Sequence, residues 1–216
     1  MVQQEVKKKI QSPKLGLLEE GVLYSSEDAE FYCNKKFTSI EENSVSFQDI
    51  TFDGCFFERI DFSSIILEDV DLIDVVFRHC DLSNQVFDKR LLSRVQFDNC
   101  KLVGTSFVDA SLKDVWFQET NVSYANFSKA KMSYVMITDS DFSFTTFLET
   151  KINHIALENV KFVGAEFFQM SLKGIDLSSC EIRDTKFDSG SIRGAKIHFL
   201  QCQDLISMLG VEVVEK

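Results

Sequence analysis

The sequence carries an apolar residue at every fifth position, without interruption, from Phe47 to Ile197. Most of the 21 phenylalanines belong to this series. A period of five matches neither the α-helix, which repeats every 3.6 residues or so, nor the β-strand, which repeats every two. A short period that is kept over such a length is typical of a repeat architecture.

The position two residues before each member of the series is also mostly apolar or small, as at Ile50, Cys55 and Ala125. Residues two apart lie on the same face of an extended strand, so both positions are expected to point inward. The other positions of each unit are mostly Asp, Ser, Asn, Lys, Glu or Gly, which suit an exposed side and a turn. Units of this kind bury their apolar pairs by stacking, so the sequence predicts an all-β solenoid.

The segment Ala125–Lys129 reads Ala-Asn-Phe-Ser-Lys and matches the repeat A(D/N)LXX, so the chain resembles the pentapeptide-repeat family. The resemblance implies a right-handed quadrilateral parallel β-helix of about eight coils, with 20 residues in each coil. The sequence supports this coil length independently, because every twentieth residue forms a column of one kind. Two phenylalanine columns are expected to face each other across the core: Phe37, Phe57, Phe77, Phe97 and Phe117, and Phe87, Phe107, Phe127, Phe147, Phe167 and Phe187.

Two inward positions break the pattern, because Gln85 and Arg90 stand where other units carry small or apolar residues. A bare charge in the core would be costly. We expect a local bulge from which the Arg90 side chain reaches solvent, and the alternative is a contact site. The unbroken period excludes an inserted loop between Phe47 and Ile197 unless its length is a multiple of five.

The period ends after Ile197, and the residues that follow have helical spacing before a short run of valines. We expect residues 199–216 to form a helix and a closing strand that cap the rod. This cap either seals the end alone or also pairs with a second copy in a C2 homodimer. The residues expected in that interface are Cys202, Leu205, Ile206, Leu209, Val211 and Val213.

The first part of the chain does not keep the repeat. We expect residues 1–31 to be an extension that is partly disordered or capping, with the first dozen disordered and a short helix possible at Ser25–Asp28. The repeat domain is expected to cover residues 32–198.

Composition narrows the function. A net charge of −11 disfavours direct nucleic-acid binding, which needs clustered Lys and Arg. No apolar run is long enough to cross a membrane or to serve as a signal peptide, so we expect a soluble, cytoplasmic protein. Four of the six cysteines sit at inward positions, and no spacing suggests a metal site. With no cofactor motif and no plausible nucleophile and base, we expect a protein that is not an enzyme.

Two further segments resemble the plasmid-borne quinolone-resistance proteins of the Qnr type. They are Thr120–Lys129 and the tail from Ile192 to Ile197 with Gln201, Leu205 and Leu209–Val211. The resemblance implies a DNA-mimicking dimer that binds DNA gyrase and topoisomerase IV and protects them from fluoroquinolones. This chain departs from some members because it has no projecting loops, and its N-terminal extension has no counterpart in them.

The negative charge is concentrated between Phe47 and Asp88, where only Arg59 and Arg78 oppose it. These carboxylates form either a partner-binding acidic face or an ordinary solvated exterior. The candidate residues are Asp49, Asp53, Glu58, Asp61, Glu68, Asp69, Asp71, Asp74, Asp81 and Asp88. Among them, Asp49, Glu68, Asp69 and Asp88 are expected to stack along one side of successive coils.

A second candidate surface is apolar, and it consists of Tyr124, Phe144, Leu148 and Phe168 at outward positions. Large apolar groups rarely gather on the exterior of a monomer without a role. We expect this patch to contact a partner protein or to pack against the N-terminal segment. The rival to a topoisomerase partner is a structural or adaptor solenoid, or an immunity protein, that binds something else.

Overall fold

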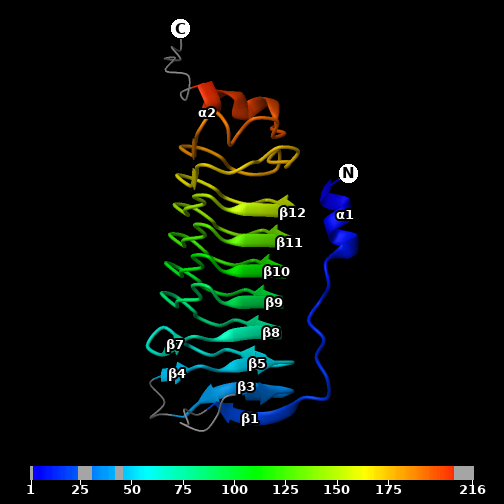
Figure 1. Ribbon diagram of the computed structural model, residues 1–216, viewed down its shortest axis with the longest axis vertical. Helices are drawn as coiled ribbons and strands as arrows, with labels where there is room; N and C mark the ends of the chain where they lie inside the picture. Colours follow the sequence, from blue (N-terminus) through cyan, green and yellow to red (C-terminus); the bar gives the residue numbers. More distant parts are fainter. Residues whose placement is uncertain (1, 24–30, 42–45, 207–216) are drawn as a thin grey trace.

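The computed structural model describes residues 2–23, 31–41 and 46–206 of the chain, and these residues form a rod of stacked coils (Figure 1). The strands of the first coils are β1 (Glu19–Leu23), β2 (Phe31–Cys33), β3 (Lys35–Ile40), β4 (Ser46–Gln48), β5 (Thr51–Asp53), β6 (Phe56–Glu58) and β7 (Ile66–Glu68). The later strands are β8 (Asp71–Arg78), β9 (Leu91–Asp98), β10 (Ser111–Gln118), β11 (Lys131–Thr138), β12 (Lys151–Glu158), β13 (Glu166–Phe167) and β14 (Lys186–Phe187).

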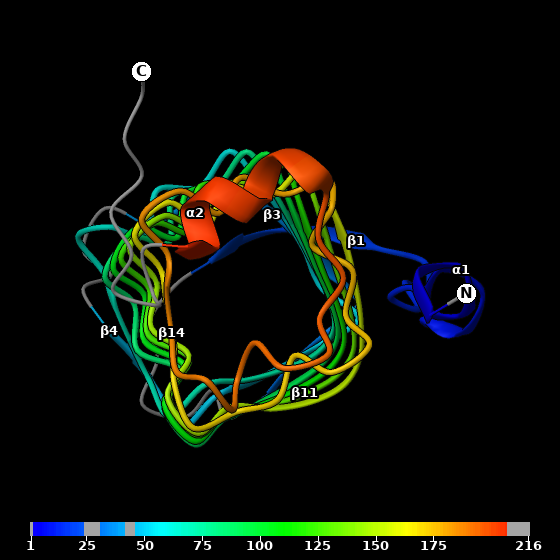
Figure 2. The same cartoon turned by 90° about the horizontal axis from the view of Figure 1, so that it is seen from above.

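The coils are four-sided when the rod is viewed along its length (Figure 2). All strand pairs are parallel. From β2 onward each residue pairs with the one that lies 20 positions further on, as Phe77 does with Phe97 and Phe97 with Phe117, whereas β1 pairs with β3 at an offset of 16 to 17 residues. The structure therefore confirms the expected parallel β-helix of about eight turns with a short C-terminal helix.

The core is made by the five-residue series. The two phenylalanine columns form continuous stacks, in which the Phe107 ring lies 5.6 Å from that of Phe87 and 4.8 Å from that of Phe127. Phe107 also meets Phe117 of the opposite column edge to face at 6.5 Å. Each buried ring contributes on the order of 1.5–3 kcal/mol before the entropy cost of ordering the chain, so these stacks hold the rod together.

The corners of the coil explain the choice of residues there. Positions ending in 4 and 9 adopt left-handed backbone, with φ between 49° and 67° at residues such as Asp139, Asn99 and His154. Asn, Asp and Gly tolerate this region best, which accounts for their frequency in the repeat. Tyr124 (φ 62°) and Phe144 (φ 58°) occupy the same kind of corner although bulky residues seldom do.

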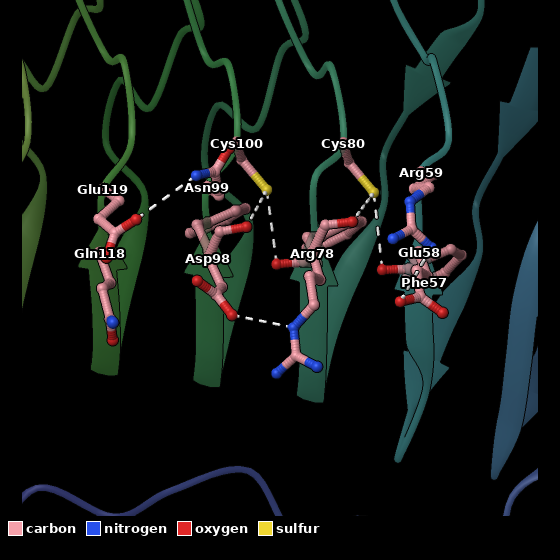
Figure 3. Close-up of polar contacts among 12 residues, drawn as sticks. Phe57, Glu58, Arg59, Arg78, Cys80, Asp98, Asn99, Cys100, Gln118 and Glu119 are labelled. Carbon is pink, nitrogen blue, oxygen red and sulfur yellow. Dashed lines mark hydrogen bonds and ion pairs between the residues drawn. The ribbon is translucent and has the colours of Figure 1, made fainter.

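Small polar groups at inward positions are satisfied by backbone carbonyls. The Cys80 thiol donates to the carbonyl of Phe57 and the Cys100 thiol to that of Phe77 (Figure 3). Thr105 donates in the same way to Leu82. Burial raises the pKa of Cys55 to about 11, so that thiol stays protonated. Cys55, Cys80, Cys100 and Cys180 are buried and free, as the sequence predicts.

The expectation that the first dozen residues are disordered is wrong. Helix α1 (Val2–Lys9) packs on β12 and β11, with Val6 and Ile10 buried. An extended stretch then runs along the rod to β1, which pairs with β3, so the parallel ladder begins at Glu19 rather than at residue 32. We call residues 2–18 the strap. The helix considered for Ser25–Asp28 lies outside the described residues.

The C-terminal end carries the 3-10 helix η1 (Phe199–Gln201) and helix α2 (Cys202–Ile206), which lie over the last coil (Figure 1). His198 caps η1 in a capping box with Gln201. The Gln201 amide donates to the carbonyls of Leu177 and Cys180 and so ties the helix to the coil beneath it. Leu209, Val211 and Val213 of the expected dimer interface lie outside the described residues.

Candidate partner-binding surfaces

The ten candidate carboxylates are spread around the rod and do not form one face. Asp53 and Glu58 lie on β5 and β6, which pair with different parts of β8. Asp61 and Asp81 pair in a separate ladder, and Glu68 lies on β7 in yet another. Because each ladder is one side of the coil, carboxylates project from every side of the N-terminal half.

The four carboxylates that were expected to stack along one side lie in two neighbouring columns. Asp69 lies one coil above Asp49, and Asp88 lies one coil above Glu68. The two columns touch, since the Asp49 amide donates to the Glu68 carbonyl at 3.1 Å. Asp69 forms an ion pair with Arg90 at 2.9 Å, which removes one charge from the array.

Most of the other carboxylates already have partners within the rod. Asp81 accepts hydrogen bonds from Ser83 and lies 3.4 Å from the Lys101 ammonium, and these contacts outweigh partial burial and lower its pKa. Asp88 accepts from the Ser106 hydroxyl and the Val108 amide. Asp49, Asp61, Glu68 and Asp69 are exposed.

Asp74 was expected in the acidic face, but this is wrong because its side chain is buried and the residue is only 6% exposed. The Arg94 guanidinium donates two hydrogen bonds to its carboxylate, both of 2.6 Å, and the Lys14 amide of the strap donates a third of 2.8 Å. Burial by itself raises the pKa of Asp74, but these hydrogen bonds outweigh it and hold the pKa below the usual value. Asp74 therefore anchors the strap and is not available to a partner.

The strap is held at a second point, where the Gln11 amide donates to the carboxylate of Asp114 at 3.0 Å. Asp114 is 2% exposed. Sequence analysis missed the strap, although the spacing of Val6 and Ile10, four residues apart, is that of an apolar helix face. That spacing could have predicted the N-terminal helix.

The apolar patch has an exposed half and a covered half. The rings of Tyr124 and Phe144 stack in parallel at 5.0 Å, and they are 62% and 50% exposed. Phe144 also lies against the backbone of Gly164, where any β-carbon would come within 2.7 Å of the ring. Leu148 and Phe168 are partly buried.

The strap does not cover this patch. Helix α1 packs against β11 and β12, where the Tyr134 and His154 rings stack at 4.7 Å. The alternative in which the N-terminal segment covers Phe144 is therefore wrong, and the partner alternative stays a prediction. Trp116 is partly buried, and its indole N–H has no hydrogen-bond partner in the part of the chain that the structure describes.

The irregular positions Gln85 and Arg90 coincide with an interruption of one wall. Their own backbone keeps the regular turns, so the bulge expected there is wrong. Instead the preceding coil departs from the pattern, and β7 pairs with β4 alone. Arg90 does reach outward, as expected, where it meets Asp69.

The C-terminal cap leaves apolar side chains exposed at the end of the rod. Phe199 is 81% and Leu200 is 73% exposed. Of the residues expected in a dimer interface, Cys202 is exposed, whereas Leu205 and Ile206 are partly buried. None of the helices in the described residues is long and apolar enough to cross a membrane, and those residues contain no group of three or more metal-ligating side chains.

Comparison with known sequences agrees with this architecture. A family model described as a pentapeptide repeat region matches residues 70–141, and one described as pentapeptide repeats (8 copies) matches residues 46–84. No curated protein matches the chain. Residues 46–141 therefore carry pentapeptide repeats, and the solenoid that such repeats form is known as a structural or binding fold.

Two solved structures are similar to this chain. The full-length structure of QnrB1, a plasmid-mediated fluoroquinolone resistance protein, is 18% identical, with 90% of this chain and 100% of that chain covered and a TM-score of 0.45. HetL, which is involved in heterocyst differentiation regulation in Nostoc sp. strain PCC 7120, is 13% identical, with 89% and 91% covered and a TM-score of 0.47. These matches concern the fold alone.

Proposed function

We propose that this protein binds a type II topoisomerase, DNA gyrase and/or topoisomerase IV, as a mimic of DNA and protects it from fluoroquinolones. The observation that carries the proposal is that the candidate carboxylates of the N-terminal half, such as Asp53, Asp61 and Glu68, project from different sides of a straight rod. A duplex also presents negative charge on every side, so a rod with carboxylates on one face would be a poorer mimic. A groove rich in Lys and Arg would attract such a rod, and the attraction would weaken with salt.

The rod is proposed to act as a cytoplasmic homodimer joined through its C-terminal cap. Phe199 and Leu200 support this part of the proposal, because they place exposed apolar area at the end of the rod. In a dimer of this kind both free arms would be the acidic N-terminal halves. Sedimentation at decreasing micromolar concentrations tests the pairing, and a strict monomer would contradict it.

The test of the main proposal is a gyrase supercoiling assay with ciprofloxacin, repeated with topoisomerase IV. We expect the protein to restore activity, and a variant with Asp49→Asn, Asp61→Asn and Glu68→Gln to restore much less. Glu149→Gln with Glu166→Gln and Glu181→Gln is the matched control, since all three residues lie in the C-terminal half and the variant also removes three negative charges. Failure of the unaltered protein with both enzymes would reject topoisomerase protection.

An adaptor that binds another protein is the second candidate, and the exposed stack of Tyr124 and Phe144 favours it. If protection fails in the assay, Tyr124→Ser with Phe144→Ser separates the two surfaces. A partner that still binds this variant does not use the stack, whereas loss of binding assigns it to the apolar patch. The Thr146→Ala variant on the same coil serves as the folding control.

A further inference from the structure

One wall of the rod is open between two consecutive coils. Along this wall, residues ending in 6 are bridged to the next coil, as Val86 is to Ser106 and Ser106 to Asn126. Below the opening, β7 pairs with β4. Between β7 and Val86 no backbone pairing occurs in the described residues, so the ladder that joins all later coils is missing here.

Two long side chains account for the opening. Gln85 occupies an inward column whose later members are Thr105, Ala125, Thr145 and Ala165. Its amide donates to the carbonyls of Phe62 (2.8 Å) and Ile65 (2.7 Å), and its oxygen accepts from the Leu67 amide (3.1 Å). The Gln85 side chain thus takes hydrogen bonds that the neighbouring backbone makes in closed coils.

Arg90 does the same at the next corner. The next three residues of its column are Ala110, Ala130 and Thr150, which are small enough to stay inside. The Arg90 side chain passes outward between the coils and pairs with Asp69 at 2.9 Å. There the Leu91 amide donates to the Asp71 carboxylate at 2.7 Å rather than to a backbone carbonyl.

The result is a groove of about 790 Å³ between the two coils, lined by residues 63–69 and by residues 83–86 and 88–90. It lies on the side of the rod away from α1 (Figures 1 and 2). Ile66 on the lower lip is 61% exposed and Val86 on the upper lip is 51% exposed. Neither the amide nor the carbonyl of Val86 makes a hydrogen bond within the described chain.

We propose that this groove binds an extended, basic segment of a partner protein, which pairs with the backbone of Val86 on the upper lip. The free amide and carbonyl of Val86 select a strand, because main-chain hydrogen bonds supply the recognition, whereas Gln85 already holds the Ile65 carbonyl and the Leu67 amide of the lower lip. Ile66 and Val86 offer an apolar contact for one side chain of the segment. The groove shares Glu68, Asp69 and Asp88 with the candidate acidic residues, but the proposal does not depend on which protein the rod protects.

Charge selects a basic segment over an acidic one. Arg90 is already paired with Asp69, so the carboxylates of Glu68 and Asp88 outnumber Lys89 among the remaining charges of the described lining. Asp49 lies one coil below Asp69 and adds to the negative field. A Lys or Arg beside the apolar residue of the bound strand would meet this field.

The test measures binding of a labelled, end-blocked peptide, Lys-Val-Thr-Val-Lys, to the full chain at low salt. We expect saturable binding, slower hydrogen exchange at the amides of Val86 and Asp69, and at least tenfold weaker binding when the central residue is N-methylated. A peptide with both Lys replaced by Glu should bind at least tenfold more weakly. Absence of binding at millimolar peptide, or equal binding of the acidic peptide, would overturn the proposal.

Two variants separate the groove from the rest of the rod. Gln85→Thr with Arg90→Ala gives both columns their ordinary residues, so the ladder should close and binding should fall at least tenfold. Glu68→Lys leaves the ladder open and should weaken binding several-fold. Thr105→Ala, one coil above Gln85 in the same column, is the control and should bind as the unaltered chain does.

Other occupants would give different results. Unchanged peptide binding in the Gln85→Thr/Arg90→Ala variant would place the peptide elsewhere and reject the groove. If that variant instead dissociates a dimer of the unaltered chain, the occupant is a second copy, and the partner segment is rejected. Topoisomerase protection can survive or fail independently, because the peptide measurement contains no topoisomerase.

Discussion

The closed wall above Val86 and the open wall below it are built from the same repeat, yet only one forms a continuous ladder. Both keep apolar residues at the five-residue positions, as Leu67 and Phe107 show. They differ in the column two residues earlier, where the short Thr105 side chain bonds only the Leu82 carbonyl and the long Gln85 side chain takes backbone groups of Phe62, Ile65 and Leu67. The period therefore decides that the chain coils, and the size of the second inward residue decides whether neighbouring coils close.

The largest effect is expected in the closed region. Phe107→Ala removes a ring that is stacked on both sides and should lower the free energy of unfolding by about 3–5 kcal/mol. Leu67→Ala, on the lip of the open region, should cost nearer 2 kcal/mol because the lip can relax into the gap. Denaturant melts measure both, and equal losses would contradict the idea that the open lip is the more deformable.

A double-mutant cycle on the opening is expected to give the next largest effect. Gln85→Thr alone should destabilise by about 1–3 kcal/mol, since the Leu67 amide and two carbonyls lose their partner while Arg90 still separates the lips. Adding Arg90→Ala should recover most of this loss, because the ladder can then close. Simple additivity of the two changes would show that they do not share one opening.

Acid should loosen the strap at the anchor nearest the open region. The pKa of Asp74 is lowered in the folded state, so its contribution to stability is complete above the unfolded value of about 3.9 and is lost as the pH falls through the folded value. Hydrogen exchange of the Lys14 amide should therefore accelerate below about pH 4. Asp74→Asn should give fast exchange at every pH, while Asp71→Asn, whose carboxylate does not touch the strap, should behave as the unaltered chain.

The smallest effect is expected for ion pairs on the closed wall. Lys186 and Glu166 lie 2.8 Å apart one coil from each other, and their side chains are 63% and 35% exposed. Lys186→Ala should change the free energy of unfolding by less than about 0.5 kcal/mol, and added salt should remove even that difference. A larger change would mean that surface pairs, and not the inward columns, hold neighbouring coils together.

The sequence predicted the fold because a strict period leaves few ways to bury the same positions in every coil. The inward columns, the facing phenylalanine stacks and the buried cysteines all follow from residue type and spacing. The fate of Asp74 could not be predicted in this way, since its burial depends on Lys14, which lies far away in the chain. Gln85 and Arg90 stood out in the sequence at the place where the groove forms. The coil whose backbone departs from the regular pattern is the preceding one, however, and that departure depends on how hydrogen bonds are shared between the two coils.

The spacing of the two strap anchors matches the rise of the coils between them. Its two anchors, Gln11 on Asp114 and Lys14 on Asp74, are three residues apart, which in extended form is roughly 10 Å. The two coils between Asp74 and Asp114 rise by about the same distance at roughly 4.8 Å each. Deletion of one 20-residue coil between Asp74 and Asp114 would leave every remaining column in register. The strap could then form a hydrogen bond with only one of these two carboxylates.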